Sequence, residues 1–261
     1  MKKSIIMLFL LSGFLFSDNY IIPIMKKAPE IDGLVDETEW KEAIRFIGFS
    51  HMGQLQPREV KAYVGATEDK IYFAVVSELP EKGEILQEIK KDSESIVLDD
   101  AIEIWIDPYP SEETGITYQC LFNSLGYKAY LTHPRGNVKT EEYYGWNGNY
   151  KITNGFHNNF WHSEIEVDVN NLVKGRKITD GSWQINLCRD FKQPWAWASI
   201  GNESYSFGSA NQIIFKFKKD GVFVKQNMGG QPFLGKFNTG VSLYNPFEEN
   251  KEVKVKIFLK R

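Results

Sequence analysis

The sequence predicts an all-β fold: an antiparallel β-sandwich of the jelly-roll or immunoglobulin-like kind, followed by the start of a second β-sandwich. Apolar and polar residues alternate with a period of two in many short segments, which is typical of strands that have one buried face. Glycine, asparagine, aspartate and proline separate these segments, as expected for turns. Aromatic residues make up 14% of the chain and helix signals are weak, so a sandwich or barrel is favoured.

Residues 1–17 are predicted to form a signal peptide. Lys2 and Lys3 precede an apolar run from Ile5 to Phe16, and the small residue Ser17 follows it. About 12 apolar residues are too few to cross a bilayer, which needs about 20. A buried N-terminal helix or strand is the alternative, and Leu15 fits the cleavage pattern poorly. We therefore expect export to the periplasm, cell surface or extracellular space, with no membrane insertion after cleavage.

Residues 18–217 are predicted to form the first sandwich. The expected strands are 60–66, 71–77, 101–107, 118–123, 128–132, 150–154, 160–169, 182–189 and 212–217. Two short helices are expected, one at 37–43 with Asp36 as its N-cap and one at 80–91. In the strand 101–107, three isoleucines at even positions share one face, while Glu103, Trp105 and Asp107 share the other.

Residues 218–261 are predicted to be a linker and the first strands of a second sandwich. Strands are expected at 240–246 and 251–259, after a linker around Met228–Pro232. Two strands alone do not make a stable fold, so we expect the chain to belong to a longer multi-domain protein. The alternative is that both strands dock on the first domain.

The charge balance argues against nucleic acid as a partner. Without Lys2 and Lys3 the chain carries 29 basic and 34 acidic residues, whereas nucleic acids and anionic lipids select basic patches. The two cysteines, Cys120 and Cys188, lie in apolar strand-like segments. A disulfide and two buried free thiols both remain open, because sequence alone cannot fix their separation.

Six local motifs, in order along residues 27–217, resemble the family 9 carbohydrate-binding modules of the DOMON-like superfamily. They are Ile31-Asp32-Gly33 with Asp36, Trp40 and Ala43; the hairpin 60–77; Asp99-Asp100 with Glu103 and Asp107-Pro108; Trp161 with Glu164; Trp183 with Asn186 and Arg189; and Trp197 with Phe207-Gly208 and Ile213–Phe215. The resemblance implies a sandwich that binds an oligosaccharide or polysaccharide without catalysis. It also implies that two tryptophans hold a terminal sugar in the best-known members.

Loop and strand-edge aromatic rings are the candidate sugar platforms, because an indole stacks on the flat C–H face of a sugar. We predict the carbohydrate-binding residues Trp146, Trp197, Trp195 and Tyr144, which lie among asparagine, glycine and glutamine. Trp195 and Trp197 share a side if their segment is extended. Three tryptophans in the motifs are expected to pack in the core: Trp40, Trp161 and Trp183. Trp105 lies either under a second sheet or in a groove.

No catalytic residue is predicted. Glycosidases need two carboxyl groups about 5–9.5 Å apart, and Glu103 and Asp107 on one strand are about 13 Å apart. Glu164, Glu166 and Asp168 follow one another at about 6.6 Å steps, but a solvated strand face explains this pattern better. We expect a binding module, although a catalytic domain beyond residue 261 stays open.

Calcium is the metal that the resemblance implies. Asp99 and Asp100, or Asp32 and Asp36, could supply oxygen ligands, but turn and cap roles suit the same residues, so no ligand is assigned. Haem binding is one alternative function, since haem-binding DOMON domains use histidine or methionine ligands. The histidine-containing positions are His51-Met52, His133, His157 and His162. A structural cell-surface sandwich without a ligand is the other alternative.

Overall fold

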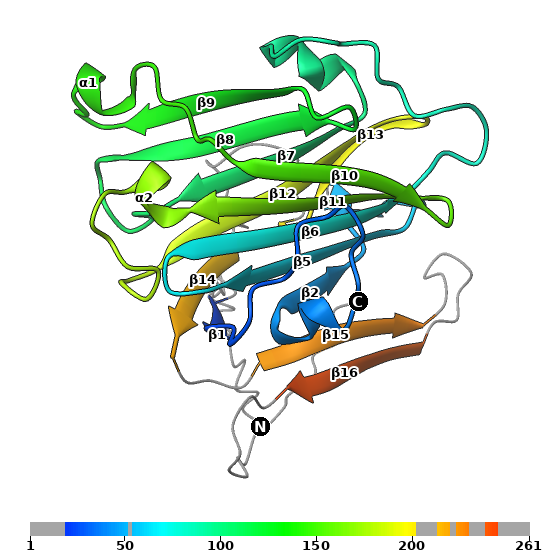
Figure 1. Cartoon of the computed structure of the whole chain (residues 1–261), viewed down its shortest axis with the longest axis horizontal. Helices are drawn as coiled ribbons and strands as arrows, with labels where there is room; N and C mark the ends of the chain where they lie inside the picture. Colours follow the sequence, from blue (N-terminus) through cyan, green and yellow to red (C-terminus); the bar gives the residue numbers. More distant parts are fainter. Residues whose placement is uncertain (1–18, 52–53, 202–212, 220–222, 230–237, 245–261) are drawn as a thin grey trace, which may run out of the picture.

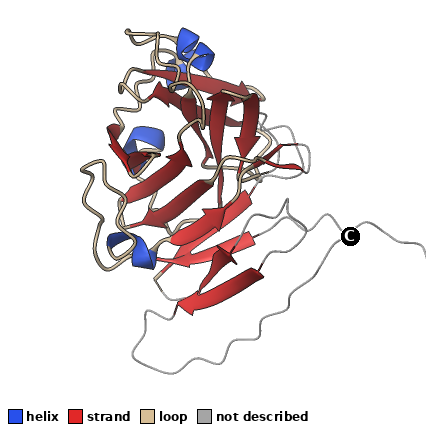
Figure 2. Cartoon of the chain, turned by 90° about the vertical axis from the view of Figure 1, so that its right-hand side faces the viewer, coloured by secondary structure: helices blue, strands red, loops and turns tan. Residues whose placement is uncertain are grey.

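In a computed structural model, the chain folds into two facing β-sheets (Figure 1). The structure describes residues 19–51, 54–201, 213–219, 223–229 and 238–244. The predicted signal peptide, residues 1–17, lies outside them. Figure 2, turned by 90°, shows that strands dominate the described chain and that its helices are short. The predicted all-β sandwich is confirmed.

The larger sheet has nine strands. Seven follow in the order β4 (Gln54–Leu55), β3 (Ser50–His51), β13 (Trp195–Ser199), β12 (Trp183–Lys192), β7 (Ala101–Asp107), β8 (Gly115–Asn123) and β9 (Lys128–Arg135). The other two are β14 (Ile213–Lys218), which pairs with β12, and β1 (Asn19–Pro23), which pairs with β14. The β1–β14 pair is parallel and the other pairs are antiparallel.

The smaller sheet has five antiparallel strands in the order β10 (Lys151–His157), β11 (Phe160–Asp168), β6 (Lys70–Glu78), β5 (Val60–Ala66) and β2 (Ile44–Ile47). The predicted hairpins 60–77 and 118–132 are therefore present as β5–β6 and β8–β9. The described ranges contain four short helices beside the sheets: η1 (Glu39–Glu42), η2 (Glu94–Leu98), α1 (Thr140–Tyr143) and α2 (Val169–Leu172). No described helix is long and apolar enough to span a membrane.

The core lies between the two sheets. The three isoleucines of β7 are fully buried in it, as their alternation predicts: Ile102, Ile104 and Ile106. Trp161 and Trp183 belong to the same core, and Trp40 is buried in a second cluster on the far side of the smaller sheet. All three tryptophans expected in the core are thus fully buried.

The helix predicted over residues 80–91 is wrong. The segment has no helix. Its backbone N–H groups donate instead to two carboxylates that lie just before β7. Asp100 accepts from Leu86, and Asp99 accepts from Glu88 and Ile89. These long-range acceptors replace the hydrogen bonds that a helix would form within itself. The helix expected at 37–43 is present as the single 3₁₀ turn η1.

A separate two-stranded sheet follows the sandwich. Strand β15 (Phe223–Gly229) pairs antiparallel with β16 (Asn238–Tyr244), and β15 lies beside β2 (Figure 1). The strand predicted at 240–246 overlaps β16, while the one predicted at 251–259 lies outside the described residues. A second module built from 218–261 stays a prediction.

Candidate functional site

One face of the larger sheet points away from the core and carries several polar and aromatic side chains. We call it the outer face. Because strand residues alternate, it takes the neighbours of the core isoleucines on β7 and the residues paired with them on β8, β12 and β13. Its members are Glu103, Trp105, Gln119, Asn186, Asp190, Lys192, Trp195 and Trp197.

A hydrogen-bonded row crosses the outer face from β9 to β7. The Nε2 atom of His133 lies 2.8 Å from the Oε1 atom of Gln119. The amide of Gln119 donates to the Oε2 atom of Glu103 at 3.0 Å, so its carbonyl is left to accept from the histidine. The indole N–H of Trp105 donates to the same Glu103 oxygen at 2.7 Å, and its ring stacks on His133. Trp105 is thus part of the floor of the outer face.

A second acid, Asp190, lies beside this row. On antiparallel strands, Asp190 and Glu103 are diagonal neighbours, since Glu103 pairs with Cys188. Only 2% of Glu103 and 0% of Asp190 is exposed. Burial, and then the charge of Glu103, raises the pKa of Asp190 well above its usual value. Burial also raises the pKa of Glu103, although its hydrogen bonds oppose this. The pair therefore keeps a proton to higher pH than a free carboxyl would.

Two neighbouring indoles stand at the end of this face. Trp195 and Trp197 have ring centroids 4.1 Å apart, as expected for alternate residues of an extended strand. Trp195 is 60% exposed. The Nζ atom of Lys192 lies 5.9 and 6.0 Å from the two ring centroids and donates to the carbonyl of Val97 at 2.7 Å. We call Trp195, Trp197 and Lys192 the tryptophan platform.

Trp146 and Tyr144 lie elsewhere. Trp146 packs 4.6 Å from Tyr118, whose strand partner is Ile106, while Trp197 pairs with Asp190, the partner of Ala101. These contacts place Trp146 and Trp197 toward opposite ends of β7, so the structure does not bring them together. Tyr144 is 83% exposed on the loop after α1.

The expected solvated face of β11 is wrong for Glu164. This side chain is fully buried and accepts hydrogen bonds from the indole of Trp40 at 2.9 Å and from the backbone of Asp32 and Gly33. Gly33 has a φ of +93°, and a Cβ there would meet the backbone of Asn154 at 3.0 Å. The Ile-Asp-Gly motif and the two motif residues Trp40 and Glu164 therefore form one hydrogen-bonded cluster with a structural role.

The aspartates proposed as calcium ligands are engaged in hydrogen bonds within the protein. Asp32 accepts from Leu34 and Asp36 from Thr38, while Asp99 and Asp100 hold the 80–91 segment. Among the described residues, no three or more His, Cys, Asp or Glu side chains are grouped to hold a metal ion. Calcium binding stays a prediction of the resemblance.

The two cysteines are free and buried. Cys120 faces the core, whereas Cys188 pairs with Glu103 on the outer face, so their side chains point to opposite sides of the larger sheet. Burial raises the pKa of both thiols.

Comparisons with known proteins find solved structures of similar fold. No protein-family model matches the chain, and no curated protein matches it. A Bacteroides uniformis structure, described as a candidate carbohydrate-binding protein, has a TM-score of 0.56 at 11% identity and covers 77% of this chain and 99% of its own. A family 9 carbohydrate-binding module from Caldicellulosiruptor kristjanssonii, solved with glucose, has a TM-score of 0.52 at 12% identity, covering 78% and 97%.

The same module with cellotriose gives a TM-score of 0.52 at 12% identity, covering 78% of this chain and 95% of its own. At such identities the likeness establishes the sandwich fold. The assignment of a binding site has to come from the residues of this chain.

Three residues of the outer face were not predicted as site residues: Gln119, Asp190 and Lys192. His133 was considered only for the haem alternative. The alternation along β7 did predict that Glu103 and Trp105 share the face opposite the isoleucines. The positions of Gln119 and Asp190 beside Glu103 could not be predicted in this way, because they depend on the register between neighbouring strands.

Proposed function

We propose that this chain binds carbohydrate without covalent chemistry, on the outer face of the larger sheet, with the tryptophan platform as its stacking surface. One observation carries the proposal: Trp195 is largely exposed and lies against Trp197, beside the ammonium of Lys192. Exposed indoles offer their faces to the C–H side of a sugar ring. The ammonium of Lys192 can donate to sugar hydroxyls at the ring edge.

The buried acids below the platform support binding rather than hydrolysis. A carboxyl that acts as a general acid or base must reach the bond it protonates. Glu103 and Asp190 are almost completely buried, and Glu103 is already held by the N–H groups of Trp105 and Gln119. In the proposal, they hold neighbouring side chains of the outer face in place and do not contact the ligand.

The similar structures suggest which sugars to test. The Caldicellulosiruptor kristjanssonii module carries glucose in one structure and cellotriose in the other. We infer that β-linked glucans are reasonable test ligands for this chain too. Export, through the predicted signal peptide, would bring the protein to such glycans, and residues 218–261 would connect it to a further module.

Isothermal titration of glucose and cellotriose into the purified protein tests the proposal. We expect Trp195→Ala and Trp197→Ala each to weaken cellotriose binding about tenfold or more, because each removes one stacking ring. Phe156→Ala, an exposed ring of β10, is the matched control and should bind as the wild type does.

Undiminished affinity in both tryptophan variants would overturn the assignment of the platform. A Soret band in the absorbance spectrum of the purified protein would instead favour the haem-binding alternative. Absence of binding across a glycan array would favour a structural sandwich.

A further inference from the structure

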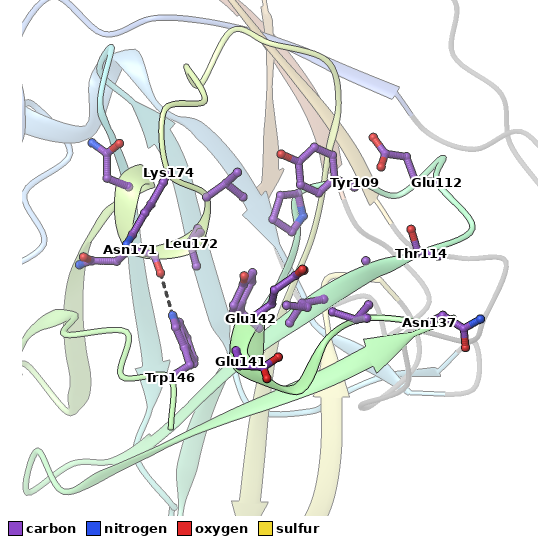
Figure 3. A pocket seen from close by; sticks show the side chains of 17 residues that line it. Tyr109, Glu112, Thr114, Asn137, Glu141, Glu142, Trp146, Asn171, Leu172 and Lys174 are labelled. Atoms are coloured by element: carbon purple, nitrogen blue, oxygen red, sulfur yellow. Dashed lines mark hydrogen bonds between the residues drawn. The ribbon is translucent and has the colours of Figure 1, made fainter. Parts of the chain in front are cut away.

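A second site lies at the other end of the sandwich. A cleft of about 670 Å³ opens between α1, α2 and the connection from β7 to β8, and Trp146 forms one side of it (Figure 3). This volume is within the usual range of small-molecule sites. In Figure 3, Glu141 and Glu142 enter it from one side and Tyr109 faces them from another.

The walls of the cleft are fixed by side chains behind them. Arg135 donates to the carbonyl of Tyr109 at 2.9 Å, and the guanidinium of Arg176 lies 4.5 Å from the Tyr109 ring centroid. On the opposite wall, Asn171 accepts from the indole N–H of Trp146 at 2.7 Å and donates to Gly148 at 3.0 Å. The aromatic sides of the cleft are therefore preformed.

The cleft carries a surplus of negative charge. Three carboxylates line it and one cation does: Glu112, Glu141 and Glu142, with Lys174. Within the described residues, none of the three glutamates forms a salt bridge. The nearby Arg135 is paired with Asp107.

A tyrosine side chain also lines the cleft. Tyr118 lines it, is only 6% exposed, and packs its ring 4.6 Å from that of Trp146. No described residue forms a hydrogen bond with its hydroxyl. Burial, with the nearby charges of Tyr109 and Glu142, raises the pKa of Tyr118 to about 12, so the phenol keeps its proton at neutral pH. This hydroxyl therefore offers a hydrogen-bond partner to a polar ligand.

We propose that this cleft binds a sugar unit that carries a protonated amino group. The indole and phenol rings suit the flat face of a sugar, and cations bind well over aromatic rings. The unpaired carboxylates of Glu141 and Glu142 suit the ammonium. The Tyr118 hydroxyl and the amide of Asn137 suit sugar hydroxyls. The site is independent of the tryptophan platform.

Three trisaccharides with one β-1,4 backbone separate the amino group from the rest of the ligand: those of glucosamine, N-acetylglucosamine and glucose. Isothermal titration at pH 6 uses the Trp195→Ala/Trp197→Ala variant, so that the platform contributes nothing. We expect the glucosamine trisaccharide to bind about tenfold tighter than the other two, and less tightly as salt is raised.

Two conservative variants then address the cleft in the same background. Glu142→Gln removes one charge and Tyr118→Phe removes only the hydroxyl, and each should weaken glucosamine trisaccharide binding severalfold to about tenfold. Glu81→Gln, an exposed acid away from the cleft lining, should leave binding unchanged. Circular dichroism confirms that each variant is folded.

Equal affinity for the three trisaccharides would overturn the proposal, as would unchanged binding in both cleft variants. Spermidine binding as tight as that of the glucosamine trisaccharide would overturn the assignment to a sugar. Because the platform is already removed, none of these results depends on whether the platform binds glucan.

Discussion

Two neighbouring residues of β12, one basic and one acidic, lie on opposite faces of the larger sheet, and their side chains have different kinds of partner. Arg189 points into the core and donates to Asp100 at 2.7 Å and to the hydroxyl of Ser77 at 3.1 Å. Asp190 points to the outer face, where it lies beside another acid, Glu103, and interacts more weakly with Lys192. Both Arg189 and Asp190 are fully buried.

The partners of the two side chains suggest different effects on stability: Arg189 is paired with an acid, whereas Asp190 lies beside another acid. The inner pair joins the two sheets, because Ser77 lies on β6 and Asp100 leads into β7. A second arginine, Arg58, lies 3.9 Å from the same Asp100 oxygen. The outer pair places two buried acids side by side, next to Trp195 and Trp197. Burial and the neighbouring acid oppose ionisation of each group, so we expect this arrangement to cost free energy of folding at neutral pH.

Breaking the inner pair should have the largest effect. Arg189→Met leaves Asp100 buried without its main partner, so we expect the free energy of unfolding to fall by about 3–5 kcal/mol. Urea denaturation measures this. A loss below about 1 kcal/mol would contradict the structural role of the pair.

The outer acid should respond with the opposite sign. Asp190→Asn replaces an acid whose ionisation is opposed by burial and by Glu103, and we expect the free energy of unfolding at pH 7 to rise by about 1 kcal/mol. The pKa of Asp190 is raised in the folded state, so the unfolded chain binds fewer protons between the ordinary and the raised value. Stability of the wild type should therefore fall as pH rises through that window, and the variant should lose this part of the slope.

Asp100→Asn is the matched control for that substitution. It removes the charge that compensates Arg189, so it should destabilise the protein where Asp190→Asn stabilises it. Urea denaturation from pH 4.5 to 8 compares both variants with the wild type. Equal destabilisation by the two would remove the distinction between the faces.

The platform ring should have the smallest effect on stability. Trp195 is largely exposed, so Trp195→Ala should change the free energy of unfolding by less than about 0.5 kcal/mol. Thermal and urea unfolding check this. A loss of 2 kcal/mol or more would make Trp195 a packing residue rather than a ligand platform.

Much of the fold could be predicted because its signals are local. The alternation in β7 identified the core isoleucines, and the turn residues identified two hairpins. The segment 80–91 could not be predicted, since its conformation depends on Asp99 and Asp100, which accept its N–H groups from a later part of the chain. Glu164 was misjudged for the same reason, because its partners lie more than 120 residues earlier.

The site was predictable only where its residues are neighbours in sequence. Trp195 and Trp197 were expected on one side, and they lie together. The separation of Trp146 from them depends on strand order, as does the row from His133 to Glu103 across three strands. Long-range register carries this information, and no local pattern contains it.

The most direct test of the central claim is to follow the indole N–H signals of the tryptophans by NMR while cellotriose is added. We predict that the signals of Trp195 and Trp197 shift as the sugar binds, while those of the buried Trp40, Trp161 and Trp183 stay in place. Shifts confined to Trp146, or binding that moves no tryptophan signal, would contradict a sugar site on the outer face.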